Sequence, residues 1–132
     1  MYGPDRVRPG DTTAVLAIAY GNRGAAYDAK GLYDQAIADD TQAIALNPQD
    51  AMDHYNRGAA YGHKGLLDQA VTDYTRAIAL DPQHANAYYN RGRVYEATGL
   101  HDQAIADYRA ALKWNQTRQD ALGALKRLGA TP

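Results

Sequence analysis

The 132-residue chain has no cysteine, no serine and no phenylalanine, and it has a single glutamate among its 15 acidic residues. Without cysteine there are no disulfides, no thiolate chemistry and no zinc–thiolate site, and without serine there is no serine nucleophile. No apolar run approaches the roughly 20 residues that a membrane-spanning helix needs. With a formal net charge of -1 and dispersed basic residues, the chain has no general attraction for nucleic acid or anionic lipid.

The first twelve residues differ in composition from the remainder. They contain two prolines and two glycines, which is typical of a lead-in or linker, and we expect one domain over residues 13–130. Residues 1–6 lack the apolar segment of a signal peptide, so the default expectation is a cytoplasmic protein, with the compartment left open. The bias toward alanine, arginine, aspartate and glycine favours a GC-rich bacterial genome.

The chain is dominated by a 34-residue period. Residues 17–50, 51–84 and 85–118 align without gaps; the first two blocks agree at 21 of 34 positions and the second and third at 14. A period of this length predicts stacked structural repeats. After the third block, Leu122, Leu125 and Leu128 share one face of a short amphipathic segment, which predicts a capping helix over residues 119–130.

Each block predicts two helices. A glycine recurs in the middle of the first helix, at Gly24, Gly58 and Gly92. It costs roughly 1 kcal/mol against alanine there, which predicts a close helix–helix approach. Further glycines end the first helices, and prolines end the second helices of blocks one and two. Block three has Gln116 in the proline column, so the end of its second helix is not marked.

These columns resemble the tetratricopeptide repeat (TPR). Block two shows the pattern as Gly58, Tyr61, Ala70, Tyr74, Ala77 and Pro82, and the resemblance covers residues 17–118. The departures are confined to single sites: His54 and Asp40 replace aromatic residues, and Gln116 replaces proline. The resemblance implies an all-α fold, a right-handed α-solenoid of antiparallel helix pairs with about seven helices. It also implies a protein-interaction module whose first helices line a concave groove that holds a peptide or a partner helix.

The predicted groove lies on the first-helix face opposite the glycine and tyrosine stripe. Its amides can bond a peptide backbone, its tyrosines and methionine supply adaptable area, and its arginine can pair with a carboxylate. The predicted partner-binding residues are Met52, Tyr55, Asn56, Asn86, Tyr89, Asn90 and Arg93. A solvated face without a dedicated ligand is the alternative interpretation.

Chaperone-binding members of the family use lysines, asparagines and arginine as a clamp for the C-terminal tails of Hsp70 or Hsp90. The clamp columns here read Gly21, Ala25, Asn56, Asn86 and Asn90. Only Asn56 matches and the basic residues are missing, which argues against an Hsp70 or Hsp90 tail as partner. The partner is therefore a protein or peptide of unknown identity.

Other residue groups favour structure over chemistry. Three arginines in the first helices and three aspartates in the second predict repeated inter-helix ion pairs. His54 and His63 lie on opposite faces of one helix, so no metal site is expected. No carboxylate pair is placed for acid–base work and no phosphate loop occurs. We expect no enzyme, catalytic residue or cofactor. Self-assembly through the solenoid ends or the groove is the alternative function and implies a homo-oligomer; Trp114, the missing proline at Gln116 and the leucine face of the last helix could serve it.

Overall fold

The computed structural model describes residues 9–132, with side-chain detail from residue 12 onward. These residues form seven α-helices and no strand. In chain order the helices are α1 (Pro9–Ala29), α2 (Tyr33–Leu46), α3 (Ala51–His63), α4 (Leu67–Leu80), α5 (Ala85–Ala97), α6 (His101–Trp114) and α7 (Gln119–Arg127). The predicted all-α class and the predicted number of helices are confirmed.

The first helix begins earlier than the sequence pattern indicates. The lead-in was expected over residues 1–12, but α1 starts at Pro9. Proline suits the first helical position because its missing N–H would have no partner within the helix there. The expected lead-in is therefore corrected for residues 9–12, and its remaining part lies outside the described residues.

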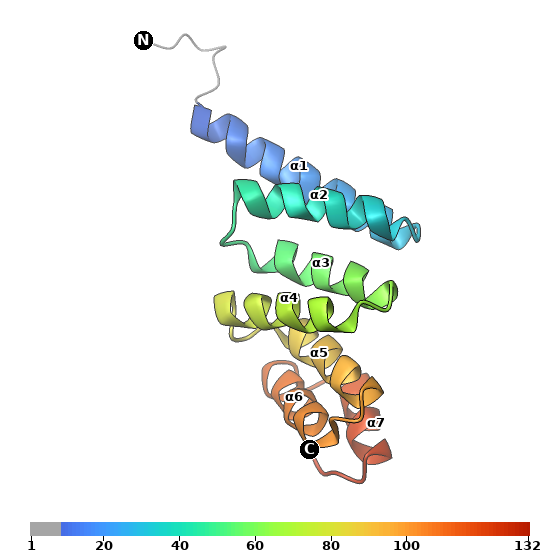
Figure 1. Cartoon of the computed structure of the whole chain (residues 1–132). Coiled ribbons are helices and arrows are strands. Elements are labelled where there is room, and N and C mark those ends of the chain that lie inside the picture. Colours follow the sequence, from blue (N-terminus) through green and yellow to red (C-terminus); the bar gives the residue numbers. More distant parts are fainter. Residues whose placement is uncertain (1–8) are drawn as a thin grey trace.

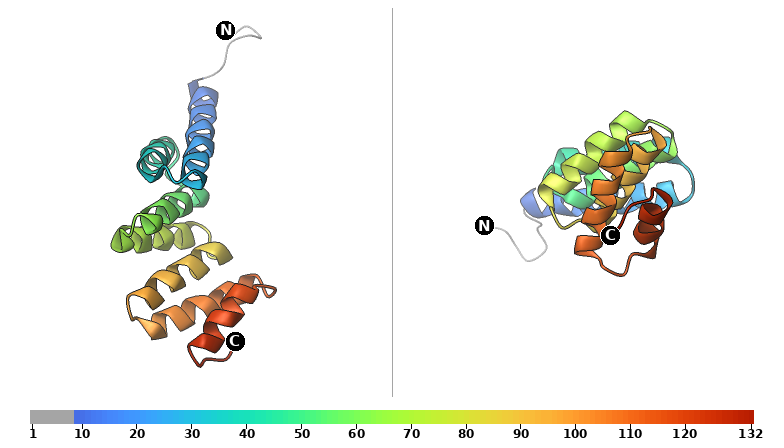
Figure 2. Two further views of the ribbon diagram at one scale, coloured as in Figure 1. Left: turned by 90° about the vertical axis from the view of Figure 1, so that its right-hand side faces the viewer. Right: turned by 90° about the horizontal axis from the view of Figure 1, so that it is seen from below.

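The helices stack as antiparallel pairs into an elongated superhelix (Figure 1). The pairs are α1 with α2, α3 with α4, and α5 with α6, and each pair packs on the next through α2 with α3 and α4 with α5. The perpendicular views show successive pairs rotated relative to one another, so the stack curves (Figure 2). The first helices α1, α3 and α5 consequently line one side of the superhelix.

Glycine in mid-helix allows the close approach that the repeat predicts. A Cβ atom at Gly58 would lie 3.0 Å from ring carbons of Tyr74 in α4. A Cβ at Gly92 would lie 3.0 Å from the ring of Tyr108 in α6. The tyrosine ring of the paired helix thus packs directly against the helix backbone at each of these glycines.

Glycine also ends the first helix of every repeat. Gly31, Gly65 and Gly99 have φ angles of 77°, 79° and 80°, a conformation that favours glycine. The next residue donates its N–H back across the turn, as Leu66 does to the carbonyl of Tyr61 at 2.9 Å. This pattern satisfies the last carbonyls of the helix and turns the chain toward the second helix.

The third repeat ends its second helix as sharply as the other two, although it lacks proline. α6 stops at Trp114, in the same column as the last residues of α2 and α4. Asn115 follows, and its Oδ1 accepts hydrogen bonds from the N–H of Thr117 at 3.2 Å and from its hydroxyl at 2.8 Å. Asn47 and Asp81 accept from the backbone two residues on in the same way. The turn is therefore set by this polar side chain, and the expected loss of a boundary at Gln116 is wrong.

The predicted inter-helix ion pairs are present in all three repeats. Arg57 of α3 binds Asp73 of α4 through Nε at 2.7 Å and Nη2 at 2.8 Å. The same two-bond pairing joins Arg23 to Asp39 and Arg91 to Asp107. Bidentate pairing adds geometric specificity to the attraction between opposite charges. These pairs therefore set the register of the two helices within each repeat.

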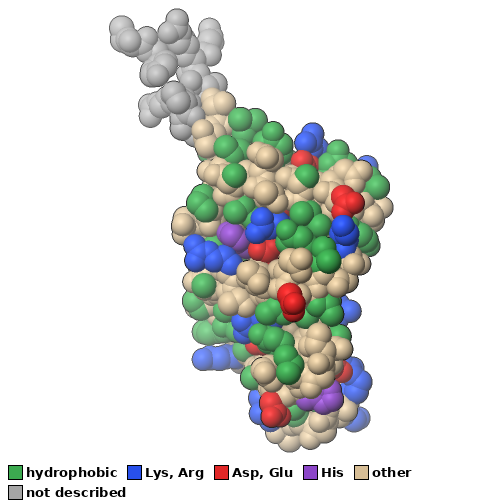
Figure 3. Space-filling view, in the orientation of Figure 1, with side chains coloured by type: hydrophobic (Ala, Val, Ile, Leu, Met, Phe, Trp, Pro, Cys, Tyr) green, Lys and Arg blue, Asp and Glu red, His purple; other side chains and the backbone are tan. Residues whose placement is uncertain are grey.

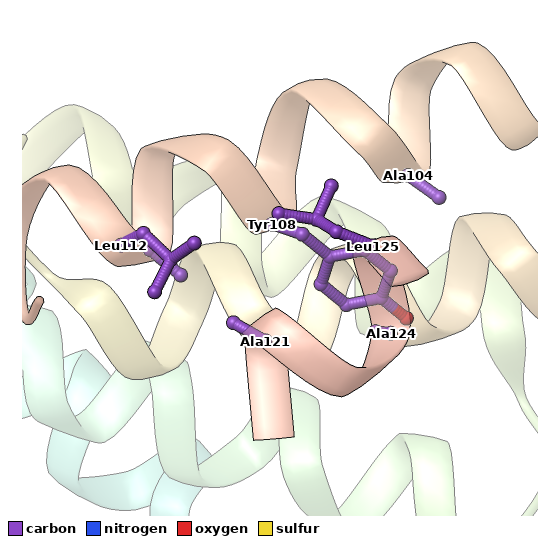
Figure 4. Packing of buried hydrophobic residues seen from close by; sticks show 7 residues of the cluster. Ala104, Tyr108, Leu112, Ala121, Ala124 and Leu125 are labelled. Carbon is purple, nitrogen blue, oxygen red and sulfur yellow. The ribbon is translucent and has the colours of Figure 1, made fainter. Parts of the chain in front are cut away.

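The C-terminal end of the stack is sealed. α7 packs on α6, and its Ala121, Ala124 and Leu125 are at most 1% exposed. They form one apolar cluster with Tyr108 and Leu112 of α6 (Figure 4). Leu122 and Leu128 pack against this cluster as well. The structure thus places α7 where the sequence predicts a capping helix.

Candidate functional site

A hollow lies between α3 and α5 on the side lined by the first helices. Its volume is about 410 Å³. Four of the predicted groove residues line it: Tyr55, Asn56, Asn90 and Arg93. Its apolar wall is formed by Tyr74, Leu67 and Val94. Asp28 and His63 lie where the hollow meets α1. The structure therefore brings together the central part of the predicted set.

Tyr55 is held in place by its neighbours. Its ring centroid lies 5.8 Å from that of Tyr74 and 4.8 Å from that of His84. Its hydroxyl accepts a hydrogen bond of 2.8 Å from Nδ2 of Asn90, and burial raises the pKa of this hydroxyl. Tyr55 is accordingly a rigid wall of the hollow, and an Asn90 amide that already bonds Tyr55 keeps only part of its bonding capacity for a ligand.

Asn56 and Arg93 are the polar groups left to meet a ligand. Asn56 is half-buried and Arg93 is exposed. The guanidinium of Arg93 lies 6.0 Å from the ring centroid of Tyr89 and is paired with no carboxylate among the described residues. An amide with both a donor and an acceptor beside an unpaired cation suits a peptide backbone that carries an acidic group nearby.

Tyr89 is covered by a residue that the sequence analysis did not single out. The guanidinium of Arg118, just before α7, lies 4.4 Å from the ring centroid of Tyr89. Arg118 also donates to Oδ1 of Asn86 and is paired with Asp120 through two hydrogen bonds. Tyr89 and Asn86 are therefore engaged within the chain. No sequence pattern points to this contact, because Arg118 occupies the last column of block three, where blocks one and two have Asp50 and His84.

Met52 and Asn86 line a different hollow from the central one. This second hollow also measures about 410 Å³ and lies between the starts of α3 and α5 and the end of α6. Trp114, 40% exposed, forms part of its wall. Six of the seven predicted groove residues are thus divided between two hollows, and Tyr89 lines neither of them.

The first repeat has a different interior from the other two. In repeats two and three, a tyrosine of the first helix lies against a tyrosine of the second, as Tyr55 does against Tyr74. The corresponding residues of repeat one are Gly21 and Asp40. The carboxylate of Asp53, from α3, fills the space beside Gly21, where a Cβ would lie 2.6 Å from its Oδ1.

This exchange places two carboxyl groups where the other repeats have aromatic rings. Asp40 is 0% exposed, and neither of its carboxylate oxygens has a hydrogen-bond partner among the described residues. Burial and the nearby Asp53 raise the pKa of Asp40 to about 7. Burial and Asp50 raise the pKa of Asp53 to about 6. The sequence showed that Asp40 departs from the repeat, but its complete burial depends on packing between repeats.

His54 shows how another departure is accommodated. In repeat three, the hydroxyl of Tyr88 donates to the carbonyl of Pro82 at 3.1 Å. In repeat two, Nε2 of His54 lies 3.0 Å from the carbonyl of Pro48 in the same geometry. The imidazole therefore replaces the tyrosine hydroxyl as a donor, and His54 is buried, with 7% exposed.

Neither a metal-binding cluster nor a membrane-spanning helix occurs among the described residues. Within residues 12–132, no group of three or more histidine, aspartate or glutamate side chains is arranged to hold a metal ion. Across the described helices, none is both long and apolar enough to cross a lipid bilayer.

Comparison with known proteins identifies the family. Family models described as the tetratricopeptide repeat match residues 17–50 and 85–118, and one described as the TPR repeat matches residues 63–99. The TPR domain of Arabidopsis OM64 is 30% identical, with a TM-score of 0.87 over 89% of this chain and 97% of that one. The chain belongs to the tetratricopeptide repeat family, as the resemblance in its sequence indicated.

Two further solved structures resemble the chain and contain bound peptides. The first TPR of Spaghetti (RPAP3), bound to the HSP90 peptide SRMEEVD, is 26% identical, with a TM-score of 0.85 over 88% of this chain and 92% of that one. The second TPR domain of human RPAP3, in complex with the HSP70 peptide SGPTIEEVD, is 25% identical, with a TM-score of 0.80 over 92% and 99%. Comparison with curated proteins gives no significant match.

Proposed function

We propose that this chain is an adaptor module that binds an extended peptide or a partner helix in the hollow between α3 and α5. The single observation that carries the proposal is the arrangement of Asn56 and Arg93, available polar groups, around a wall fixed by Tyr55. A preformed wall lowers the entropy that binding costs. The peptide complexes of similar TPR domains support the same kind of function.

The ligand we propose differs from the HSP tails of those complexes. At the clamp columns this chain has Gly21, Ala25 and Asn86, so it lacks the basic residues that the family uses for a C-terminal carboxylate. The structure adds Arg118 to the groove side, but the charge of Arg118 is already paired with Asp120. Arg93 is thus the cation through which the hollow would select an acidic side chain.

A peptide-binding experiment tests the proposal without disturbing the core. Random linear peptides displayed on phage are selected on the whole chain, and a selected peptide is then measured by fluorescence anisotropy. Asn56→Ala with Arg93→Ala should weaken binding at least about tenfold, or ~1.4 kcal/mol. Arg76→Ala, an exposed arginine of α4 that lines neither hollow, is the matched control and should leave affinity unchanged. Equal affinity in all variants would contradict the proposal.

Self-assembly through the C-terminal end is not the function that the packing favours. The leucine face of α7, which was expected to mediate self-assembly, instead packs within the chain. Leu125 is 1% exposed, and Leu122 and Leu128 pack on the same cluster. Of the residues considered for this role, Trp114 stays 40% exposed, and it borders the second hollow. Light scattering over a range of concentrations checks this, with a monomer expected.

A further inference from the structure

The N-terminal end of the stack differs from the sealed C-terminal end. Side chains of α1 that are apolar remain in solvent: Leu16 is 46% exposed, Val15 62% and Ile18 63%. Hydrophobic side chains are visible at the surface over α1 in the space-filling view (Figure 3). A depression of about 260 Å³ lies on this helix, lined by Leu16, Ala19, Tyr20 and Arg23.

The equivalent columns of α3 and α5 are covered. Ala26 of α1 is exposed, whereas Ala60 and Val94, at the same position of the 34-residue repeat, are 0% and 8% exposed. Ala19 is exposed, whereas Ala87 in its column is 0% exposed. What covers these columns in α3 and α5 is the second helix of the preceding repeat, α2 or α4. The exposed strip of α1 is therefore a copy of a packing face that the chain uses twice, and none of residues 12–132 covers it.

The occupied copies show what chemistry fits this face. On α5, Val94 forms one cluster with α4 residues, against which Leu67 and Val71 also pack. Arg91 of α5 donates through Nη1 to the hydroxyl of Thr75 in α4 at 3.1 Å. Leu67, Val71 and Thr75 are spaced i, i+4 and i+8, so they share one helix face.

The α2–α3 interface repeats this chemistry. Nη1 of Arg57 donates to the hydroxyl of Thr41 at 3.3 Å, and Thr41 lies eight residues after Tyr33 and four after Ile37. In α1, Arg23 uses Nε and Nη2 for Asp39. No residue between 12 and 132 accepts from its Nη1, and its side chain is 59% exposed, against 21% for Arg57.

We propose that the strip of α1 formed by Leu16, Ala19, Tyr20, Arg23 and Ala26 docks an amphipathic helix of a partner protein. The partner helix carries two apolar residues at i and i+4 and a threonine or serine at i+8. The apolar pair covers the positions of Ala19 and Ala26. The hydroxyl accepts a hydrogen bond from Nη1 of Arg23, which donates to no described residue. This surface is separate from the hollow between α3 and α5 and does not depend on its ligand.

A second copy of the chain does not supply such a helix. Its α2 and α4 carry the pattern, but the faces concerned are packed within their own stack. Its α6 has Arg109 in the threonine column and is covered by α7. A second copy of the chain is therefore not the occupant that the chemistry of the strip fits.

The chain itself provides the probe for a test. A peptide of residues 66–83, which spans α4, is stapled away from positions 67, 71 and 75, and its helicity is confirmed by circular dichroism. It is titrated into the labelled whole chain up to about 1 mM and followed by NMR. We expect saturable shifts of the amides of Ala19, Arg23 and Ala26.

Matched variants identify the surface and the hydrogen bond. Ala26→Glu, in the strip, should abolish the shifts, while Ala25→Glu, on the adjacent exposed column of α1, should leave them unchanged. A peptide with Thr75→Val should bind several-fold more weakly. No saturable shift up to the highest concentration, or shifts confined to Tyr55 and Asn90, would overturn the proposal. A dimer of the chain that Ala26→Glu dissociates would also overturn it, by assigning the strip to a second copy.

Discussion

The buried carboxyl of Asp40 leads to a specific prediction about stability and pH. In the folded chain, burial and the nearby Asp53 raise the pKa of Asp40 from 3.8 to about 7. The folded state thus holds this proton more tightly than the unfolded state does. The stability that results is fully present below pH ~4 and is lost as the pH rises through about 7. A shift of this size corresponds to a stability difference on the order of 4 kcal/mol across that range.

Replacing Asp40 by asparagine isolates this effect. The amide has nearly the shape of the protonated carboxyl but carries no charge at any pH. We expect Asp40→Asn to match the parent chain near pH 4 and to exceed its free energy of unfolding by several kcal/mol near pH 8. Urea denaturation followed by circular dichroism at both pH values measures this difference, and other titrating groups cancel because both proteins contain them.

A surface aspartate provides the control. Asp68 lies exposed in the first turn of α4, so Asp68→Asn should change stability by less than about 1 kcal/mol at either pH. A carbon-detected NMR titration of the Asp40 carboxyl should also show a midpoint near 7. If the two asparagine variants show the same dependence on pH, the assignment of the pH effect to Asp40 is refuted.

Four substitutions test the packing of the stack by urea denaturation. Arg57→Ala strands Asp73, whose side chain is 4% exposed, and should cost about 3–5 kcal/mol; a cost below ~1 kcal/mol would mean that Asp73 finds another partner. Gly58→Ala forces a Cβ to within 3.0 Å of a tyrosine ring and should destabilise the chain, whereas Gly62→Ala meets its nearest atom at 3.8 Å and should stabilise it by up to ~1 kcal/mol. Equal effects would show that the approach at Gly58 is not tight. Leu125→Ala, in the cap, should cost about 2–5 kcal/mol, and a smaller loss would mean that α7 does not seal the stack.

The features that the sequence predicted best are those that repeat. Gly24, Gly58 and Gly92 occupy one column, and three copies of an unfavourable mid-helix residue have few explanations other than a close approach. The arginine and aspartate columns predicted ion pairs for the same reason. A contact that occurs three times at constant spacing leaves its signature in a single sequence, because the stacking geometry is the same each time.

The features that the sequence missed occur once. Arg118 covers Tyr89 only because α7 follows the third repeat and no fourth repeat begins there. The column of Arg118 in the repeat therefore carried no information about its contact. Gln116 led to the opposite kind of error, a predicted irregularity that does not occur. The end of α6, which the missing proline was expected to leave unmarked, is set by Asn115. Side chains whose partners lie outside the repeat must be read from the structure.

We expect the two interfaces between repeats to differ in strength, and this bears on where binding occurs. Because a solenoid's stability is approximately a sum over repeats and neighbouring interfaces, one interface can be weaker than the other. The first contains Asp40 and Asp53 in place of aromatic rings, and it adjoins the uncovered strip of α1. The second contains Tyr55, which accepts a hydrogen bond from Asn90 and lies against His84, and it is followed by the end that α7 covers. The hollow that we propose as the peptide site lies on the better-supported interface, where its walls are held before a ligand arrives. The first repeat, with the weaker interface and the open helix face, is the part of the stack from which a docked helix would gain most.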